Sequence, residues 1–292
     1  MTQTVPTSAE KNEDWDLEIN ARSGWLDLHL KDIWRYRDLL RMFVWRDFVA
    51  VYKQTILGPI WFFIQPLLTT ATFTIIFSGV AKLSTDGLPP LLFYLAGTAP
   101  WNYFATCLTK TSTTFKDNAS LFGKVYFPRL ITPLSVVIST LMQFLIQFLT
   151  LGIALIWFLW CGYDIHPDWT GVILGTPALI MLLGGLGLGF GIIISSLTTK
   201  YRDLAFLITF GVQLAMYATP VVYPLSTVPE KYRPWLELNP MTGIIEAFRA
   251  IFLGVGSFSW SLLSYSASVT LVVLVLGVIV FNRVEKTFMD TV

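Results

Sequence analysis

Asp164, His166 and Asp168 are the residues whose types and spacing come closest to catalytic chemistry. Two carboxylates and an imidazole within one short segment can supply a general base or a metal ligand. His29, the only other histidine, is far away in the sequence, and neither histidine has the spacing of a catalytic triad or a zinc site. Both cysteines lie in or beside apolar runs, which is typical of inert thiols. The sequence therefore predicts no catalytic residue and no metal site, with a membrane-embedded transferase that uses this segment as the alternative.

The sequence also lacks a phosphate-binding loop for ATP. The nearest match to Gly-x-x-x-x-Gly-Lys-Ser/Thr is Gly123-Lys124, which is followed by valine and lacks the first glycine. The glycine-rich run 184–191 fails the dinucleotide-binding pattern, because Phe190 stands where the last glycine is required. Its small-x-x-x-small pairs favour close helix packing in lipid instead. We therefore expect the chain itself to bind no cofactor.

The composition is that of a membrane protein. Hydrophobic residues make up 54% of the chain and charged residues 13%, whereas charged residues make up about 25% of a typical soluble domain. Six runs of roughly 20 residues or more contain no Asp, Glu, Lys or Arg, and each is long enough as a helix to cross about 30 Å of hydrocarbon. These runs are 57–81, 88–109, 130–161, 170–199, 204–229 and 255–282. The predicted fold class is all-α, a polytopic membrane protein with six transmembrane helices.

The charges that flank these runs predict the orientation and the domain organisation. Sixteen of the 20 Lys and Arg residues lie on the side of the termini, so the positive-inside rule places both termini in the cytosol. Residues 1–25 are charged and lack an apolar core, which predicts a flexible cytosolic tail. Residues 26–56 have the spacing of an amphipathic helix in the headgroup plane. Residues 57–283 are expected to form the transmembrane domain and 284–292 a cytosolic C-terminus.

The apolar segment 241–254 is too short to span the membrane. It would be about 21 Å long as a helix, and Glu246 and Arg249 interrupt it. With the prolines before it, it predicts a re-entrant helical hairpin at about 224–254, on the outer side between the fifth and sixth spans. The two charges either pair on a helix surface at i,i+3 spacing or take part in gating an outer exit. The candidate gate residues are Pro220, Pro224, Asn239, Pro240, Glu246 and Arg249.

Neutral polar and aromatic residues form stripes on the first and fifth runs. No run carries an internal ionisable residue, which argues against coupling to an ion gradient. Rings, amides and hydroxyls along a path suit a ligand with apolar C–H faces and many hydroxyl groups, such as a sugar. Alternatively, the rings fill helix interfaces and the polar groups hydrogen-bond between helices. The candidate path residues are Phe62, Gln65, Thr69, Phe73, Phe206, Phe210, Gln213 and Tyr217.

Five segments carry a recognisable pattern. They are 34–40, Arg46-Asp47, the Tyr-Lys-Gln-Thr-Ile-Leu-Gly-Pro-Ile-Trp block at 52–61, Gln65-Pro66-Leu67 and Asn239-Pro240-Met241. Together they resemble the membrane subunit of type 2 ABC exporters of polysaccharide, closest to O-antigen exporters, with teichoic-acid and capsule exporters as relatives. The resemblance implies a homodimer in the bacterial cytoplasmic membrane that exports a lipid-linked glycan, docked on two copies of a separately encoded ABC ATPase that binds ATP and Mg. An ABC exporter of a small drug or lipid is the alternative, and the sequence predicts no nucleic-acid partner.

The resemblance also implies where the ATPase docks. The amphipathic helix is similar to the family's interface helix, and the basic, aromatic loop 116–129, expected to project from the spans, is similar to its coupling loop. The turn 200–203 is either a second contact with this partner or a signal of orientation by charge alone. Basic residues here can also attract anionic headgroups of membrane lipids, including a pyrophosphate-linked carrier. The candidate coupling residues are Arg41, Arg46, Lys53, Phe122, Lys124, Tyr126, Arg129 and Arg202.

Overall fold

The computed structural model describes residues 30–53, 55–56, 58–125, 127–198, 201 and 203–289, and all secondary structure in these ranges is helical. The expected tail at 1–25, the coupling candidates Tyr126 and Arg202, and residues 290–292 lie outside the described residues. The helices are α1 (Leu30–Arg35), α2 (Arg37–Tyr52), η1 (Gly58–Ile60), α3 (Trp61–Phe73), the π-helix η2 (Thr74–Val80), α4 (Pro90–Ser112), α5 (Thr114–Asp117), α6 (Ala119–Phe122), α7 (Ile131–Trp160), α8 (Trp169–Thr198), α9 (Leu204–Tyr217), η3 (Leu225–Thr227), α10 (Arg233–Glu237), α11 (Pro240–Leu253) and α12 (Trp260–Met289).

Four helical stretches are long and apolar enough to cross a membrane. They are Trp61–Val80, Ile131–Trp160, Trp169–Thr198 and Trp260–Val284, and they correspond to the first, third, fourth and sixth expected spans. The second expected span forms α4, which has 23 residues but is not one of these four. The fifth expected run is α-helical only over the 14 residues of α9, because Pro220 and Pro224 cannot continue an α-helix.

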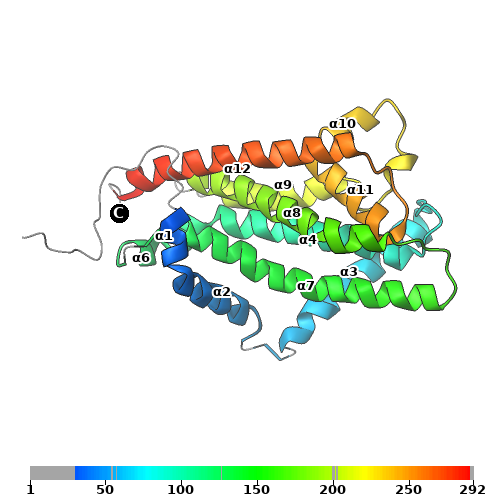
Figure 1. Ribbon diagram of the computed structural model, residues 1–292, viewed down its shortest axis with the longest axis horizontal. Helices are drawn as coiled ribbons and strands as arrows, with labels where there is room; N and C mark the ends of the chain where they lie inside the picture. The colour runs from blue at the N-terminus through cyan, green and yellow to red at the C-terminus, as the bar shows by residue number, and fades with distance from the viewer. Residues whose placement is uncertain are drawn as a thin grey trace, which may run out of the picture.

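The long helices run side by side, and the short elements gather at the two ends of the bundle (Figure 1). α1, α6 and the C-terminal end of α12 lie at one end, which we call the inner end after the expected orientation. α10 and α11 lie at the opposite end, which we call the outer end. α4 is the central helix: it packs against α3, α7, α8, α9 and α11, and 16 of its 23 residues are buried.

Glycines let α8 approach α4 and α12 closely. A Cβ added at Gly191 would lie 2.5 Å from the Cβ of Thr111 in α4, and one added at Gly189 would lie 2.9 Å from Cγ1 of Val273 in α12. Only glycine permits contacts this short. The packing role predicted for the run 184–191 is therefore confirmed.

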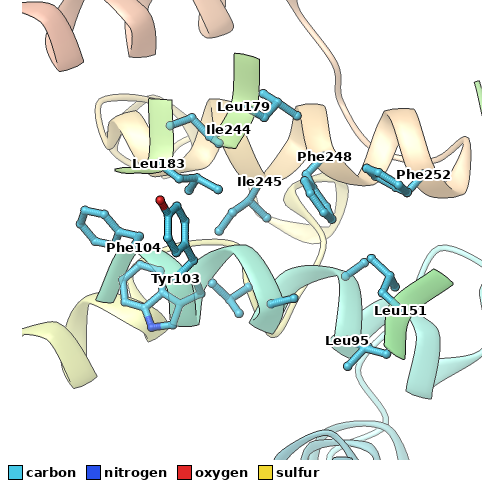
Figure 2. Packing of buried hydrophobic residues seen from close by; sticks show 14 of the residues in the cluster. Leu95, Tyr103, Phe104, Leu151, Leu179, Leu183, Ile244, Ile245, Phe248 and Phe252 are labelled. Carbon is cyan, nitrogen blue, oxygen red and sulfur yellow. The ribbon is translucent and has the colours of Figure 1, made fainter. Parts of the chain in front are cut away.

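Two clusters of buried apolar side chains hold the helices together. The large core joins α4, α7, α8 and α11, and Figure 2 shows Ile245 and Phe248 of α11 on the side toward α4, with Ile244 beside Leu179 of α8. The small core lies toward the inner end and joins α2, α5, α6, α7, α8 and α12. Its members are Phe43, Phe115, Phe122, Phe127, Ile131, Ile192 and Phe281.

Candidate functional site

α11 is the short helix expected within 241–254, and local sequence sets both of its ends. The Asn239 side chain caps the N-terminus by accepting a hydrogen bond from the Met241 amide at 3.0 Å. Pro240 occupies the first turn, where a backbone N–H has no helical partner. Gly254 ends the helix in the left-handed conformation, with φ of 69°. At 14 residues α11 is too short to cross a bilayer.

Glu246 and Arg249 form a buried ion pair. Each residue is only 1% exposed, and Nη1 of Arg249 lies 3.4 Å from Oε1 of Glu246. The interpretation of a pair on a helix surface is therefore wrong. The reason is that α11 is inserted against α4, α8 and α12, which cover it nearly all round.

Arg249 connects α11 to two other parts of the chain. Nη1 donates to the Pro220 carbonyl and Nη2 to the Val221 carbonyl, both at 2.6 Å. The guanidinium also lies 3.9 Å from the ring centroid of Phe93 in α4, in cation–π contact. Gly97, one turn further along α4, makes room for it, since an added Cβ would lie 2.7 Å from Nη2. The segment after α9, α4 and α11 are thus fixed to one another at this point.

Glu246 extends the same set of contacts to the chain after α11. Its Oε2 accepts a hydrogen bond from the Ser257 amide at 2.8 Å. α11 is not among the four candidate spans. Burial lowers the pKa of Arg249 to about 10, and the nearby negative charge of Glu246 opposes that change. Arg249 therefore stays protonated near neutral pH. We call Phe93, Pro220, Glu246, Arg249 and Ser257 the outer charge network.

The structure places the other gate candidates beside this network. Asn239 Nδ2 donates to Thr219 Oγ1 at 2.8 Å, one residue before Pro220. The Pro240 carbonyl accepts a hydrogen bond from Ser266 in α12 at 2.7 Å. Pro224 is buried in the same turn region. Sequence reasoning missed Phe93, Gly97 and Ser257. Phe93 and Gly97 are marked in the sequence only as an aromatic residue and a glycine four residues apart in an expected span, and Ser257 carries no such signal.

The path candidates on α9 share one exposed face. Phe206, Phe210 and Tyr217 are 82%, 60% and 51% exposed, and Gln213 is exposed as well. α9 packs on α4 and α8 with its other side. In a single chain this aromatic and amide stripe is therefore left uncovered.

The path candidates on α3 divide between two environments. Phe62 is buried and its ring stacks on Phe48 of α2 at 6.0 Å. Phe73 is half-buried, and its ring meets the edge of Tyr94 in α4 at 6.2 Å. Here the rings fill helix interfaces, as the alternative interpretation predicted. Gln65 alone is well exposed, whereas Thr69 is half-buried.

The loop expected to project at the inner end is instead folded onto the bundle. Phe122 is buried in the small core, and Phe127 meets Phe43 of α2 edge to face at 5.7 Å. Arg129 is 5% exposed and lies 5.3 Å from the Phe122 ring centroid. The loop is therefore joined to α2, and of its described candidates Lys124 is the one that reaches solvent.

The coupling candidates on α2 and just after it are accessible. Arg41 pairs with Asp38 at 3.3 Å with both side chains exposed, and Lys53 is exposed. Arg46 pairs with Asp47 at 2.7 Å, and Asp47 also accepts a hydrogen bond from Ser135 in α7 at 3.1 Å. The Asp47–Ser135 bond, which sequence reasoning did not identify, ties α2 to the bundle.

The segment considered for catalysis has local roles. Asp164 and His166 pair at 3.0 Å but are 91% and 81% exposed. Asp168 accepts a hydrogen bond from the Thr170 amide at 3.1 Å, at the start of α8. Among the described residues no group of three His, Cys, Asp or Glu side chains is placed to hold a metal ion.

Comparison with known proteins defines the class to which this helical bundle belongs. A family model described as ABC-2 type transporter matches residues 38–253, more than half of the chain. The chain therefore belongs to the ABC-2 type transporter family. Membership confirms the prediction of a transport subunit, not an enzyme, with ATP hydrolysis by a separate partner.

Individual relatives are named as glycan transporters. The chain is 31% identical to the O-antigen export system permease protein RfbA of Myxococcus xanthus, over 76% of this chain and 83% of the relative. It is 27% identical to an O-antigen export system permease protein RfbA of Klebsiella pneumoniae, over 87% and 94%. It is 23% identical to the polysialic acid transport protein KpsM of Escherichia coli, over 80% and 89%.

Proposed function

We propose that this chain is the permease subunit of an ATP-driven exporter that moves a lipid-linked, O-antigen-like polysaccharide across the bacterial cytoplasmic membrane. The similarity to O-antigen export permeases over most of both chains supports the substrate class. We assign the second pass to α4, and the fifth to α9 together with the chain that follows it up to Pro224, because α9 alone is too short to cross; with the four candidate spans this gives six. Both ends of the chain lie in the cytosol, in keeping with the common position of α1 and the C-terminal end of α12 at the inner end of the bundle (Figure 1).

The observation that carries this proposal is the uncovered stripe on α9. A row of exposed rings and an amide is costly to leave in lipid, because the amide finds no hydrogen-bond partner there. A second copy of the chain can face this stripe and enclose a route whose rings contact sugar C–H faces. The working unit is accordingly a homodimer with two ATPase subunits, and ATP and Mg bind to those subunits.

The inner end supplies the contacts with the ATPase. α2 and the loop 116–129 share the small core, so a displacement of either one by the ATPase is transmitted to α7, α8 and α12. The exposed cations Arg41, Lys53 and Lys124 are available to the ATPase and to the phosphates of the lipid carrier. The turn 200–203 is retained as a proposed second contact with the ATPase, although residues 200 and 202 lie outside the described residues.

The test is ATP-dependent export by the reconstituted permease–ATPase complex, scored as glycan reached by an outer-leaflet probe. Phe210→Ala and Tyr217→Ala should lower export several-fold while basal ATPase activity persists. Trp169→Ala removes a ring of similar exposure at the start of α8 and serves as the matched control. Wild-type export by both α9 variants would reject a route along α9, and export of a small drug or lipid in place of glycan would favour the alternative exporter class.

A further inference from the structure

A cavity of about 320 Å³ opens at the outer end between α10, the chain after α11 and the first turns of α12. This volume is at the lower limit of the roughly 300–1,000 Å³ that small-molecule sites occupy, so it suits one small unit. Leu238 and Leu262 supply apolar surface. The polar lining residues are Glu237, Ser257, Ser259, Ser261 and Tyr265.

The walls of this outer cavity are held in place without a ligand. The Tyr265 hydroxyl donates to the Leu238 carbonyl at 2.9 Å, which joins α12 to the end of α10. The Ser257 amide is fixed at 2.8 Å by Glu246 of the outer charge network. The hydroxyl oxygens of Ser259 and Ser261 are hydrogen-bonded at 2.6 Å. The cavity is therefore preorganised, which lowers the entropy cost of binding.

Glu237 gives the cavity its chemical character. It is the only charged residue among the described lining residues, it is half-buried, and the described chain provides it with no ion pair or side-chain hydrogen bond. A carboxylate accepts hydrogen bonds from two adjacent hydroxyls, and serine hydroxyls both donate and accept. No lysine or arginine lines the cavity, so a phosphate has no counter-charge there.

Exposed indole rings flank the lining residues in sequence. Trp235 follows Pro234 and is 74% exposed, and Trp260 lies between Ser259 and Ser261 and is 76% exposed. Indole faces contact the C–H faces of sugar rings while the N–H remains free to donate. Neither indole lines the cavity itself, whose carboxylate, hydroxyls and Tyr265 match a saccharide better than an ion or a lipid tail.

We propose that the outer cavity binds one sugar unit of the exported glycan, with Glu237 accepting hydrogen bonds from two neighbouring hydroxyls. The inference rests on the proposed function and adds to it a saccharide subsite beyond the route along α9. When a sugar unit that has reached the outer side is bound in this cavity, the rest of the glycan is hindered from sliding back toward the cytosol between transport cycles.

The experiment uses the whole permease–ATPase complex in nanodiscs, with Cys161→Ser and Ser261→Cys in the permease. The rate of labelling by a membrane-impermeant maleimide is measured with and without glycan that mild acid has released from polysaccharide of the same cells. The glycan should slow labelling several-fold. Glu237→Gln should lower its affinity about tenfold or more, the effect of losing hydrogen bonds to a charged group. Glu230→Gln, an exposed carboxylate outside the cavity, should leave protection unchanged.

Saturation-transfer NMR on the complex without the cysteine substitutions measures the same binding, in case Ser261→Cys disturbs the site. No protection together with no NMR transfer, or equal binding to Glu237→Gln, overturns the proposal. Protection by ethanolamine or Ca²⁺ at equal concentration also overturns it, in favour of a lipid headgroup or a cation. Glycan export by the same complex is measured separately. Export without glycan binding at the cavity rejects the proposed saccharide site but not the proposed function. Binding without export rejects the proposed function but not the saccharide site.

Discussion

At the outer end Arg249 is 1% exposed and bonded to backbone carbonyls of its own chain, whereas at the inner end Arg41, Lys53 and Lys124 are exposed and Arg46 is half-exposed. Both ends carry arginines, but Arg249 already has its partners within the subunit. A buried cation with every contact inside the subunit stabilises the subunit, while exposed cations can bind something else. The difference gives the Glu246–Arg249 pair a structural role and leaves the inner cations accessible to other molecules.

The largest effect is expected from Arg249→Met. The substitution leaves Glu246 buried without its cation, which should lower the free energy of unfolding by about 3–5 kcal/mol. Thermal unfolding of the purified permease measures this loss. Combining it with Glu246→Gln should restore part of the stability, because removing both charges of a buried pair is often nearly neutral. A single variant as stable as the wild type would contradict the contrast between the two ends.

Gly97→Ala should have the next largest effect. The added Cβ would lie 2.6 Å from the Val221 carbonyl oxygen and 2.7 Å from Nη2 of Arg249, and overpacking of this kind costs about 1–3 kcal/mol. Gly152→Ala in α7 is the matched control, since nothing lies within 4 Å of its added Cβ. The control should be neutral or stabilising by up to about 1 kcal/mol. Equal unfolding temperatures for the two variants would show that Arg249 is not tightly enclosed.

Ser135→Ala probes the bond that ties α2 to the bundle. Loss of the 3.1 Å hydrogen bond to Asp47 should cost about 1 kcal/mol, and ATPase activity should become less well coupled to export. Ser139→Ala is the control, because that hydroxyl bonds only within α7, to the Val136 carbonyl. The ratio of glycan exported to ATP hydrolysed measures coupling. The same ratio in both variants would remove the role given to this bond.

The smallest effect on stability is expected at Arg41. Its pair with Asp38 is exposed on both sides, so Arg41→Gln should change the free energy of unfolding by less than about 1 kcal/mol. Combined with Arg46→Gln, it should weaken export more than it weakens ATPase docking, because the proposed function assigns these cations to the phosphates of the lipid carrier. Co-purification of the ATPase and the export rate separate the two effects. An unchanged export rate would remove these residues from carrier recognition.

Sequence periodicity was sufficient to locate the three longest described helices. α7, α8 and α12 are long apolar runs, and the glycines of α8 reveal its close packing in advance because only glycine allows it. α4 is harder to recognise as a span by hydropathy, because its neighbours are protein and its polar residues do not face hydrocarbon. The extent of α9 depends on where the chain turns before Pro220.

The outer charge network could not be derived from sequence for a different reason. Glu246 and Arg249 show the i,i+3 spacing that exposed helical pairs also show. Their burial depends on the carbonyls of Pro220 and Val221, nearly 30 residues away, and a carbonyl has no sequence signature. The rings of Phe122 and Phe127 posed the same problem, since an aromatic loop residue can equally face a partner protein or its own core.

The glycine contacts of α8 have a mechanical consequence. Helices that touch through backbone atoms on both sides cannot slide past one another without a steric clash, so α4, α8 and α12 behave as a single stiff slab. α3 and α9 flank that slab, and their described contacts with it include no glycine-mediated backbone contact of this kind. Any widening of the subunit during transport is therefore expected to come from movement of helices outside the slab, such as α3 and α9, or from displacement of the slab as a whole.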